Sequence, residues 1–274
     1  MMIRTLCLVL TLLVPQVSAT KNGPGPIIAV GGGGTTDAIV AKTLALAGGK
    51  DAVVAVLPQS SESKDAGDSS VKMWLDAGAK KAFKVDFADR TAAKTLLESA
   101  SLIWMPGGDQ NRFMKIIAGT GLDDVIRAKH RAGVAVGGTS AGAAVLSQSM
   151  ITGDADLQSL TAGKTTIAPG LGLLPDVIVD QHFLRRQRQN RLTSAVLERP
   201  DQLGVGIDEA TAAIFHNGTI EVLGRSAVVV IDARGAQVEP IAADRPVAAR
   251  DVRVTILRDG MSLAVAPNPG SDSR

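Results

Sequence analysis

Short apolar runs alternate with longer stretches of mixed apolar and polar residues over the first half of the chain. Each run precedes a glycine, proline or polar turn; the runs are Ile27–Val30, Ala52–Leu57, Ala82–Val85, Leu102–Met105 and Val134–Val136. The stretches between them have helical periodicity and are Asp37–Ala47, Ser69–Ala77, Arg90–Ser99, Arg112–Ile117 and Asp123–Arg131. Buried strands that alternate with amphipathic helices predict an α/β fold with a parallel sheet covered on both faces.

The pattern changes after about residue 204. The later apolar segments are Gly204–Asp208, Thr211–Phe215, Thr219–Leu223, Ala227–Ile231 and Val252–Leu257, separated by turn residues such as Asn217-Gly218. Short strands joined by tight turns predict antiparallel hairpins, which would extend one edge of the sheet or form a small flanking ribbon. We therefore expect one domain over residues 27–265 and a loose tail over 266–274.

The amino-terminal segment has the pattern of an export signal. Arg4 precedes an apolar run, Thr5–Val14, and small residues follow at Val17-Ser18-Ala19. The run is shorter than the roughly 20 residues that a membrane-spanning helix needs, although an uncleaved anchor is the alternative. The sequence therefore predicts a signal peptide over residues 1–19, a flexible leader over 20–26, and a periplasmic or extracellular protein.

Composition excludes several classes of function. The chain has 274 residues, 45% of them hydrophobic, and a net charge of +2, so it lacks the strongly basic character of a nucleic-acid-binding protein. The only cysteine, Cys7, lies in the predicted signal, so no disulfide or thiol chemistry is expected. Gly31–Gly34 is not followed by the Lys-Ser/Thr of a phosphate loop, and no metal-ligand spacing occurs; we expect no cofactor, and we interpret the run as a turn at the active edge.

A candidate nucleophile lies in Gly138-Thr139-Ser140-Ala141-Gly142, which fits G-x-S-x-G. A predicted strand precedes this segment and a small-residue helix, Ala141–Leu146, follows it, as a nucleophile elbow requires. The backbone N–H of Ala141 would lie at the helix start, where donors are unpaired and negative charge is favoured. The alternative is a glycine turn in which Ser140 only caps the helix.

A serine nucleophile needs a base, and the chain has three histidines. His130 follows a charged segment and is expected at a solvated helix end, and His216 is expected at a hairpin tip. His182 follows a short apolar strand, Asp176–Asp180, so it would share with Ser140 the carboxyl edge of a parallel sheet, where active sites form. A buried structural histidine is the alternative for His182.

The third member of the site would orient the imidazole. Glu209 directly follows the strand Gly204–Asp208 and is the preferred acid, with Asp180 and Asp208 as weaker choices. The resulting order is Ser, His, acid, whereas α/β-hydrolases have the order Ser, acid, His.

Several motifs in matching order resemble the cyanophycinases, serine peptidases of family S51. They are Gly137–Ala143, Asp180–Phe183 with the arginines that follow, and Gly206–Ala212, while Met105–Gln110 resembles the family's oxyanion-side loop. The resemblance covers most of residues 27–232. It implies a three-layer α/β/α sandwich with a mostly parallel sheet, of the class I glutamine amidotransferase-like or flavodoxin-like type, with serine where the amidotransferases have cysteine.

The resemblance also implies roles and a substrate. Ser140 would be the nucleophile, His182 the base and Glu209 the orienting acid, with Gly108 and Ala141 as oxyanion donors. Cyanophycinases cut the backbone of cyanophycin, a poly-aspartate with arginine on each β-carboxyl, and release β-Asp-Arg dipeptides. The family also contains α-aspartyl dipeptidases, which are the alternative activity, and an amidotransferase-like binding protein without catalysis is the alternative of another class. A homodimer is implied by the family alone.

The segment after His182 is rich in arginine, whose forked guanidinium binds carboxylates such as those of an aspartate-derived substrate. On a regular helix Arg186 and Arg188 would point about 160° apart, and Arg188 and Arg191 about 60° apart, at about 100° per residue. We therefore expect one or two of these arginines to contact substrate and the others to pair with protein acids. The candidates to accept hydrogen bonds from a substrate guanidinium are Asp109, Gln110, Asp180 and Gln181.

Overall fold

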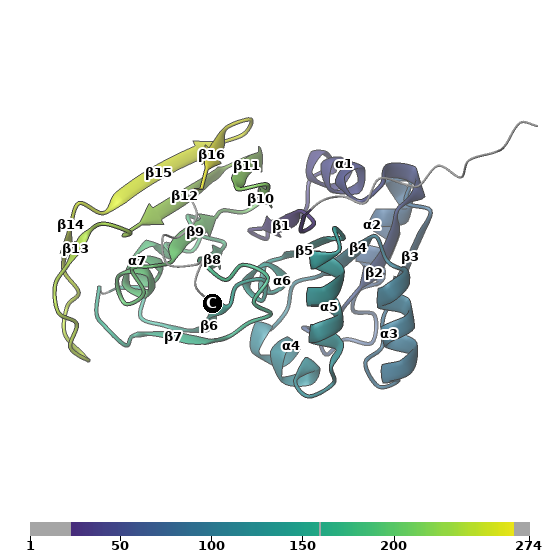
Figure 1. Cartoon of the computed structure of the whole chain (residues 1–274), viewed down its shortest axis with the longest axis horizontal. Helices are drawn as coiled ribbons and strands as arrows, with labels where there is room; N and C mark the ends of the chain where they lie inside the picture. Colours follow the sequence, from purple (N-terminus) through teal and green to yellow (C-terminus); the bar gives the residue numbers. More distant parts are fainter. Residues whose placement is uncertain (1–22, 159, 266–274) are drawn as a thin grey trace, which may run out of the picture.

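The computed structural model describes residues 23–158 and 160–265, which form two main β-sheets, with helices on their faces, and two two-stranded sheets (Figure 1). The larger sheet has eight strands in the order β16-β11-β10-β1-β5-β4-β2-β3. Its parallel strands are β1 (Ile27–Val30), β2 (Val53–Val56), β3 (Lys81–Lys84), β4 (Leu102–Met105) and β5 (Ala135–Thr139). The antiparallel strands β10 (Thr211–His216), β11 (Thr219–Gly224) and β16 (Ser262–Ala264) extend it beyond β1.

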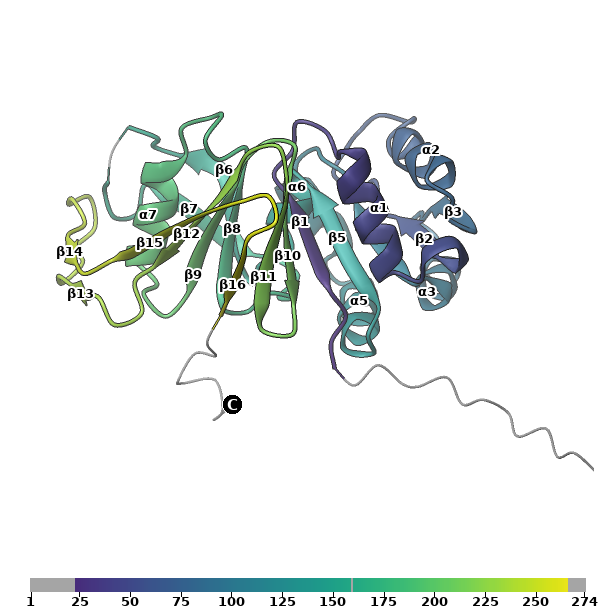
Figure 2. The same ribbon diagram turned by 90° about the horizontal axis from the view of Figure 1, so that it is seen from above.

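Helices cover both faces of the parallel strands (Figure 2). One face carries α1 (Asp37–Leu46) and α2 (Asp68–Asp76), and the other carries α3 (Arg90–Ser99), α4 (Gln110–Ile117) and α5 (Leu122–Arg131). Trp74 of α2 and Trp104 of β4 are fully buried and meet edge to face at 5.1 Å between ring centroids on the first face. Since consecutive residues of a strand point to opposite faces, the neighbouring Ile103 packs on the other face, in the hydrophobic core under α3, α4 and α5. The predicted three-layer α/β/α arrangement is confirmed.

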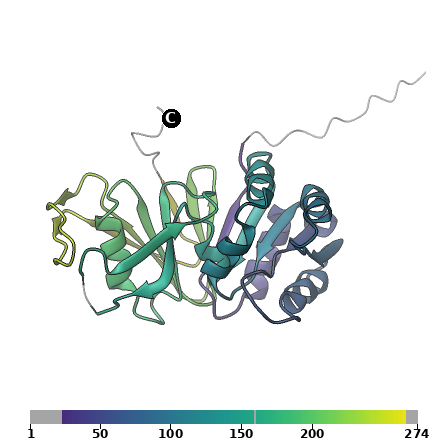
Figure 3. The ribbon, with the colours of Figure 1, turned by 90° about the horizontal axis from the view of Figure 1, so that it is seen from below.

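A second sheet lies beside the antiparallel edge of the first (Figure 3). Its order is β15-β12-β9-β8, with β8 (Val177–Gln181) parallel to β9 (Leu203–Ile207) and with β12 (Ala227–Asp232) and β15 (Arg253–Arg258) antiparallel. Alternate side chains pack on the main core or against helix α7 (Gln189–Leu197). The later strands thus both extend the main sheet and form a flanking one, but the expectation that β8 shares a sheet with the strand before Ser140 is wrong.

Several short elements were not predicted. They are the 3₁₀ turn η1 (Gly49–Asp51), the hairpin β6 (Ser149–Ala155) and β7 (Thr165–Pro169), the two-residue strands β13 (Gln237–Val238) and β14 (Ala249–Arg250), and the edge strand β16. The register of β6 shifts between Ile151 and Ala155. An irregular strand lacks the strict alternation that sequence reading detects.

The segment before β1 is packed against α5 rather than flexible. Gly25 N donates to the carbonyl oxygen of His130 at 2.8 Å, and His130 Nε2 lies 2.8 Å from the Gly25 carbonyl oxygen. Gly25, Pro26 and His130 are all buried. The flexible-leader expectation is therefore wrong for Gly25 and Pro26, and His130 is not at a solvated helix end.

The predicted signal peptide (1–19) and tail (266–274) lie outside the described residues. Within residues 23–158 and 160–265, no helix has the length and apolar character needed to cross a bilayer.

Candidate active site

Ser140 lies at the turn between β5 and the short helix α6 (Ala141–Ala144), with φ 54° and ψ −117°. A β-carbon at Gly138 would lie 2.3 Å from the carbonyl oxygen of Gly142, and one at Gly142 would lie 1.9 Å from that of Met105. Both glycines of the motif are therefore required for the close approach of backbone segments that produces the turn. The strained φ is the one expected of a nucleophile elbow, and it presents the hydroxyl at the sheet edge.

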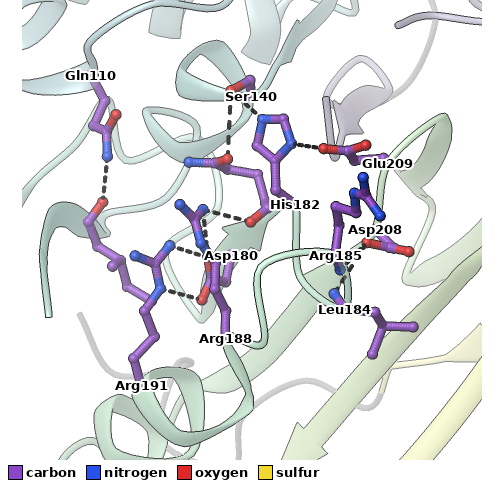
Figure 4. Close-up of polar contacts among 12 residues, drawn as sticks. Gln110, Ser140, Asp180, His182, Leu184, Arg185, Arg188, Arg191, Asp208 and Glu209 are labelled. Carbon is purple, nitrogen blue, oxygen red and sulfur yellow. Dashed lines mark hydrogen bonds and ion pairs between the residues drawn. The ribbon is translucent and has the colours of Figure 1, made fainter. Parts of the chain in front are cut away.

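The three predicted side chains meet in a row (Figure 4). Ser140 Oγ lies 2.9 Å from His182 Nε2, and His182 Nδ1 lies 2.6 Å from Glu209 Oε1. His182 directly follows the carboxyl end of β8, and Glu209 lies two residues beyond that of the parallel strand β9 in the second sheet. The ends of two sheets, rather than one edge of a single sheet, thus bring the three groups together.

The glycine run Gly31–Gly34 makes room for this row. A β-carbon at Gly32 would lie 2.3 Å from Cε1 of the His182 ring, and one at Gly33 would lie 2.6 Å from Cβ of Glu209. The carbonyl oxygen of Gly31 accepts the His182 N–H at 2.7 Å, and that of Gly32 accepts the Ala210 N–H at 2.7 Å. The run is the turn expected at the active edge, and its missing side chains leave the space that the imidazole occupies.

The surroundings keep His182 able to accept a proton. Burial lowers the pKa of His182 below its ordinary value of 6.5 despite the hydrogen bond that it donates to Glu209, which raises the pKa, and the positive charges of Arg186 and Arg188 add to the decrease. The imidazole is therefore neutral near pH 7, the form in which Nε2 can take the hydroxyl proton.

The two weaker candidates for the acid have other partners. Asp180 is fully buried, and its carboxylate accepts hydrogen bonds from Nε and Nη2 of Arg191, the first at 2.8 Å. Asp208 accepts the N–H groups of Leu184 and Arg185 and the hydroxyl of Ser226. Burial raises the pKa of Asp208, but these hydrogen bonds outweigh it and hold the pKa below its ordinary value.

The arginines do not lie on one regular helix, because α7 begins only at Gln189. Arg191 is buried against Asp180, and Arg188 donates from Nη1 to the Gln181 carbonyl oxygen at 2.6 Å. Burial and then the charge of Arg191 lower the pKa of Arg188 to about 10. The side chain of Arg186 is exposed, has no hydrogen-bond partner among the described residues, and acts on the His182 pKa through its charge. Of the three candidate arginines, Arg186 is thus the one available to a carboxylate of a substrate.

A residue that sequence reasoning missed holds the loop on the oxyanion side. The hydroxyl of Ser60 lies 3.0 Å from the Pro106 carbonyl oxygen and 2.8 Å from that of Gly107, and Ser60 is 3% exposed. The Ser60 carbonyl oxygen accepts the Asp109 N–H at 2.8 Å and lies 2.3 Å from where a Gly108 β-carbon would be. A serine in a polar loop has no spacing signal, so only the contacts reveal this clamp.

The clamp holds the loop that carries Gly108, and the second expected donor, Ala141, directly follows Ser140 at the start of α6. A β-carbon at Gly107, next to Gly108, would lie 3.4 Å from Ser140 Cβ. Within residues 23–158 and 160–265, the N–H groups of Gly108 and Ala141 donate to no protein acceptor. Unpaired N–H groups close to a nucleophile are the donors that stabilise an oxyanion.

The remaining substrate candidates separate by burial. Asp109 is exposed and caps α4 by accepting the N–H groups of Asn111 and Arg112. Gln110 is buried and donates to the Ile151 carbonyl oxygen at 3.2 Å, so it supports β6. Gln181 Oε1 lies 3.5 Å from Ser140 Oγ, which makes it the amide closest to the hydroxyl among the candidates. In the described part of the chain, no group of three or more His, Cys, Asp or Glu side chains could hold a metal ion.

The site has the parts of a hydrolase that works through a serine, and such sites occur on unrelated folds. The sequence model of peptidase family S51 matches residues 27–223. The chain therefore belongs to peptidase family S51.

Relatives and solved structures agree with this family. The chain is 39% identical over 225 residues to a cyanophycinase of Geminocystis herdmanii (strain PCC 6308), covering 78% of this chain and 83% of that protein. It is 36% identical over 225 residues to a cyanophycinase of Nostoc sp. (strain PCC 7120 / SAG 25.82 / UTEX 2576), covering 78% and 76% of the two chains. The crystal structure of a peptidase from an acI-B1 Actinobacterium has the same fold, with a TM-score of 0.65, 20% identity, and coverage of 89% of this chain and 98% of the other.

Proposed function

We propose that the chain is a serine peptidase that hydrolyses the backbone of cyanophycin and releases β-Asp-Arg dipeptides. The observation that carries the proposal is the row Ser140–His182–Glu209, at 2.9 Å and 2.6 Å, in a chain whose curated relatives are cyanophycinases. The row supports the peptide-cleaving chemistry, and the similarity to cyanophycinases supports the choice of substrate.

In the proposed reaction, Ser140 Oγ attacks the backbone carbonyl carbon while His182 Nε2 takes the hydroxyl proton. The carbonyl oxygen becomes an oxyanion that accepts hydrogen bonds from Gly108 and Ala141. The C–N bond then breaks, and the imidazolium gives its proton to the departing amine. Water attacks the resulting ester, His182 takes the water proton, and the C–O bond to Ser140 breaks with return of that proton to the serine.

Glu209 acts through His182 in this scheme. Its carboxylate accepts the hydrogen bond from Nδ1–H, which leaves Nε2 free as the acceptor of the serine proton. The Arg186 side chain is suited to bind a carboxylate of the substrate, because it is exposed, its charge acts on the imidazole, and it has no partner among the described residues. Gln181 Oε1 lies near the Ser140 hydroxyl and is suited to accept a hydrogen bond from a substrate N–H.

Incubation of the purified protein with cyanophycin and, separately, with α-Asp-X dipeptides tests the proposal by mass analysis of the products. Release of β-Asp-Arg from the polymer is expected. Cleavage of α-Asp-X with no action on the polymer would instead identify an α-aspartyl dipeptidase. Absence of any hydrolysis would favour a binding protein on the same fold.

Export and assembly belong to the proposal as well. The pattern of Arg4, the apolar run and Val17-Ser18-Ala19 supports cleavage after residue 19 and action outside the cytoplasm on external polymer. Removal of Arg4 would lower the net charge from +2 to +1. The intact mass of the secreted protein tests cleavage, and its mass in solution tests the homodimer that the family resemblance implies.

A further inference from the structure

A cavity of about 690 Å³ opens next to the loop that Ser60 clamps, and the chemistry at Ser140 does not use it. Its walls include Gln59, Ser61, Lys64, Asp86, Arg90 and Arg112. Gln59 and Asp86 lie beyond the carboxyl ends of β2 and β3, as Ser140 lies beyond that of β5. The cavity therefore opens at the same edge of the main sheet as the nucleophile.

The cavity wall is continuous with the oxyanion-side loop. Gln59 and Ser61 flank Ser60, whose hydroxyl bonds to Pro106 and Gly107 and whose carbonyl oxygen accepts the Asp109 N–H. Arg112, which also lines the cavity, lies in the first turn of α4, which begins directly after this loop. A polymer that continues from the scissile bond across this loop would therefore meet the cavity.

The charges of the cavity suit a zwitterion. Lys84 is paired with Asp68 at 2.5 Å, and Arg112 is paired with Glu62 at 2.7 Å. Lys64 and Arg90 are exposed, and within the described ranges their side chains form no ion pair. Two cations are thus available to a carboxylate.

Acceptors for a cation lie in the same cavity. The carboxylate of Asp86 accepts only the Ala88 N–H, at 2.9 Å, among the described residues. Gln59 Oε1 is shielded from solvent without a hydrogen-bond partner in that part of the chain. A buried polar atom without a partner is destabilising, so a ligand that donates a hydrogen bond to this oxygen gains from the pairing.

We propose that this cavity is a second substrate-binding site, which holds a unit of the polymer beyond the scissile bond. Lys64 and Arg90 bind the free α-carboxylate of an arginyl side arm, and Asp86 with Gln59 Oε1 binds a guanidinium. The inference rests on the proposed function, because it needs a polymer whose every unit carries both groups. Such a site favours long chains over short ones without taking part in the bond cleavage.

The test compares the double variant K64Q/R90Q with wild type on two substrates, cyanophycin polymer and an oligomer of two β-Asp-Arg units. The control is K50Q/K80Q, which removes the same charge from two exposed lysines before β2 and β3, at the opposite sheet edge. For K64Q/R90Q we expect KM for the polymer to rise about three- to tenfold with kcat unchanged. The two surface charge contacts would stabilise the bound substrate and the transition state equally, so their loss weakens binding without slowing the chemical step. Both constants for the oligomer stay at the wild-type values.

The increase should shrink at high salt, because exposed charge contacts are screened. An unchanged KM for the polymer, an equal change on both substrates, or the same change in K50Q/K80Q would overturn the inference while wild type still releases β-Asp-Arg. If wild type itself releases none, the proposed function fails, and this inference fails with it.

Discussion

At the residue scale, the site depends on the missing side chain of Gly32 as much as on the side chains that are present. The β-carbon of an alanine there would overlap the His182 ring, 2.3 Å from Cε1. The imidazole would have to leave the line between Ser140 and Glu209. Glycine at this position is therefore a requirement of the catalytic geometry rather than of the turn alone.

The substitution Gly32→Ala should lower kcat/KM about 100-fold or more, since a displacement of about 1 Å in a catalytic group has that effect. Gly34→Ala is the matched control: its φ of 102° resembles the 96° of Gly32, but its β-carbon would meet nothing within 4 Å. Steady-state kinetics and thermal melts of both variants check this. Equal losses of activity would show that backbone strain, not the overlap with His182, is responsible.

Also at the residue scale, the charge of Arg186 contributes to the pH range in which His182 acts as a base. Burial is the largest cause of the lowered His182 pKa, and Arg186 adds to it. In Arg186→Gln the His182 pKa rises, so the acid limb of the profile of kcat/KM against pH moves to higher pH. Arg131→Gln, which removes an exposed charge at the end of α5, should leave the limb in place. A limb that moves to lower pH in Arg186→Gln would contradict this electrostatic account.

At the scale of elements, the loop between β4 and α4 is held by a segment that follows β2. Without the Ser60 hydroxyl, the carbonyl oxygens of Pro106 and Gly107 lose their donor and the Gly108 N–H loses its fixed position. Ser60→Ala should lower kcat about 10- to 100-fold with little change in KM, because the donor acts on the transition state.

Ser99→Ala, which removes an exposed hydroxyl bonded within α3, is the control for Ser60→Ala. Kinetics on the polymer distinguish the two roles of Ser60. A loss confined to stability, with kcat restored at low temperature, would make Ser60 a folding residue rather than a positioning one.

Hydrogen bonds between Gly25 and His130 join the segment before β1 to the end of α5. His130→Ala should leave the Gly25 carbonyl oxygen without its side-chain donor and lower the free energy of unfolding by about 1–3 kcal/mol. His216→Ala, at an exposed hairpin turn, should change it by less than about 0.5 kcal/mol. Denaturant unfolding at pH 7 measures both.

The burial of His130 makes the free energy of unfolding depend on pH. Burial lowers the pKa of His130 in the folded protein, so the unfolded chain takes up a proton first as the pH falls. Stability should therefore decrease as the pH falls below about 6.5, and His130→Ala should weaken that dependence. An unaltered pH dependence in the variant would contradict the burial of a neutral imidazole.

At the scale of the whole molecule, the sequence predicts each part of the site better than their arrangement. Ser140 follows from a local motif, and His182 and Glu209 follow from their places after apolar strands. Which of two sheets a strand joins is decided by long-range packing, so the placement of β8 in the second sheet is not visible in its periodicity.

Other features were hidden for equally physical reasons. Charged neighbours of His130 concealed its burial, because a helix end can be exposed on one face and packed on the other. The clamp of Ser60 joins residues far apart in sequence, and no spacing rule connects them. Long-range contacts, rather than local sequence patterns, thus determine the burial of His130 and the clamp of Ser60.

The most direct measurement of the central claim is the rate at which Ser140→Ala releases β-Asp-Arg from cyanophycin, compared with wild type under the same conditions. Because the proposed bond forms at this oxygen, the rate should fall by at least about 1,000-fold while the variant keeps the wild-type fold by circular dichroism. A folded variant that retains its rate within about tenfold would show that another group attacks the peptide bond.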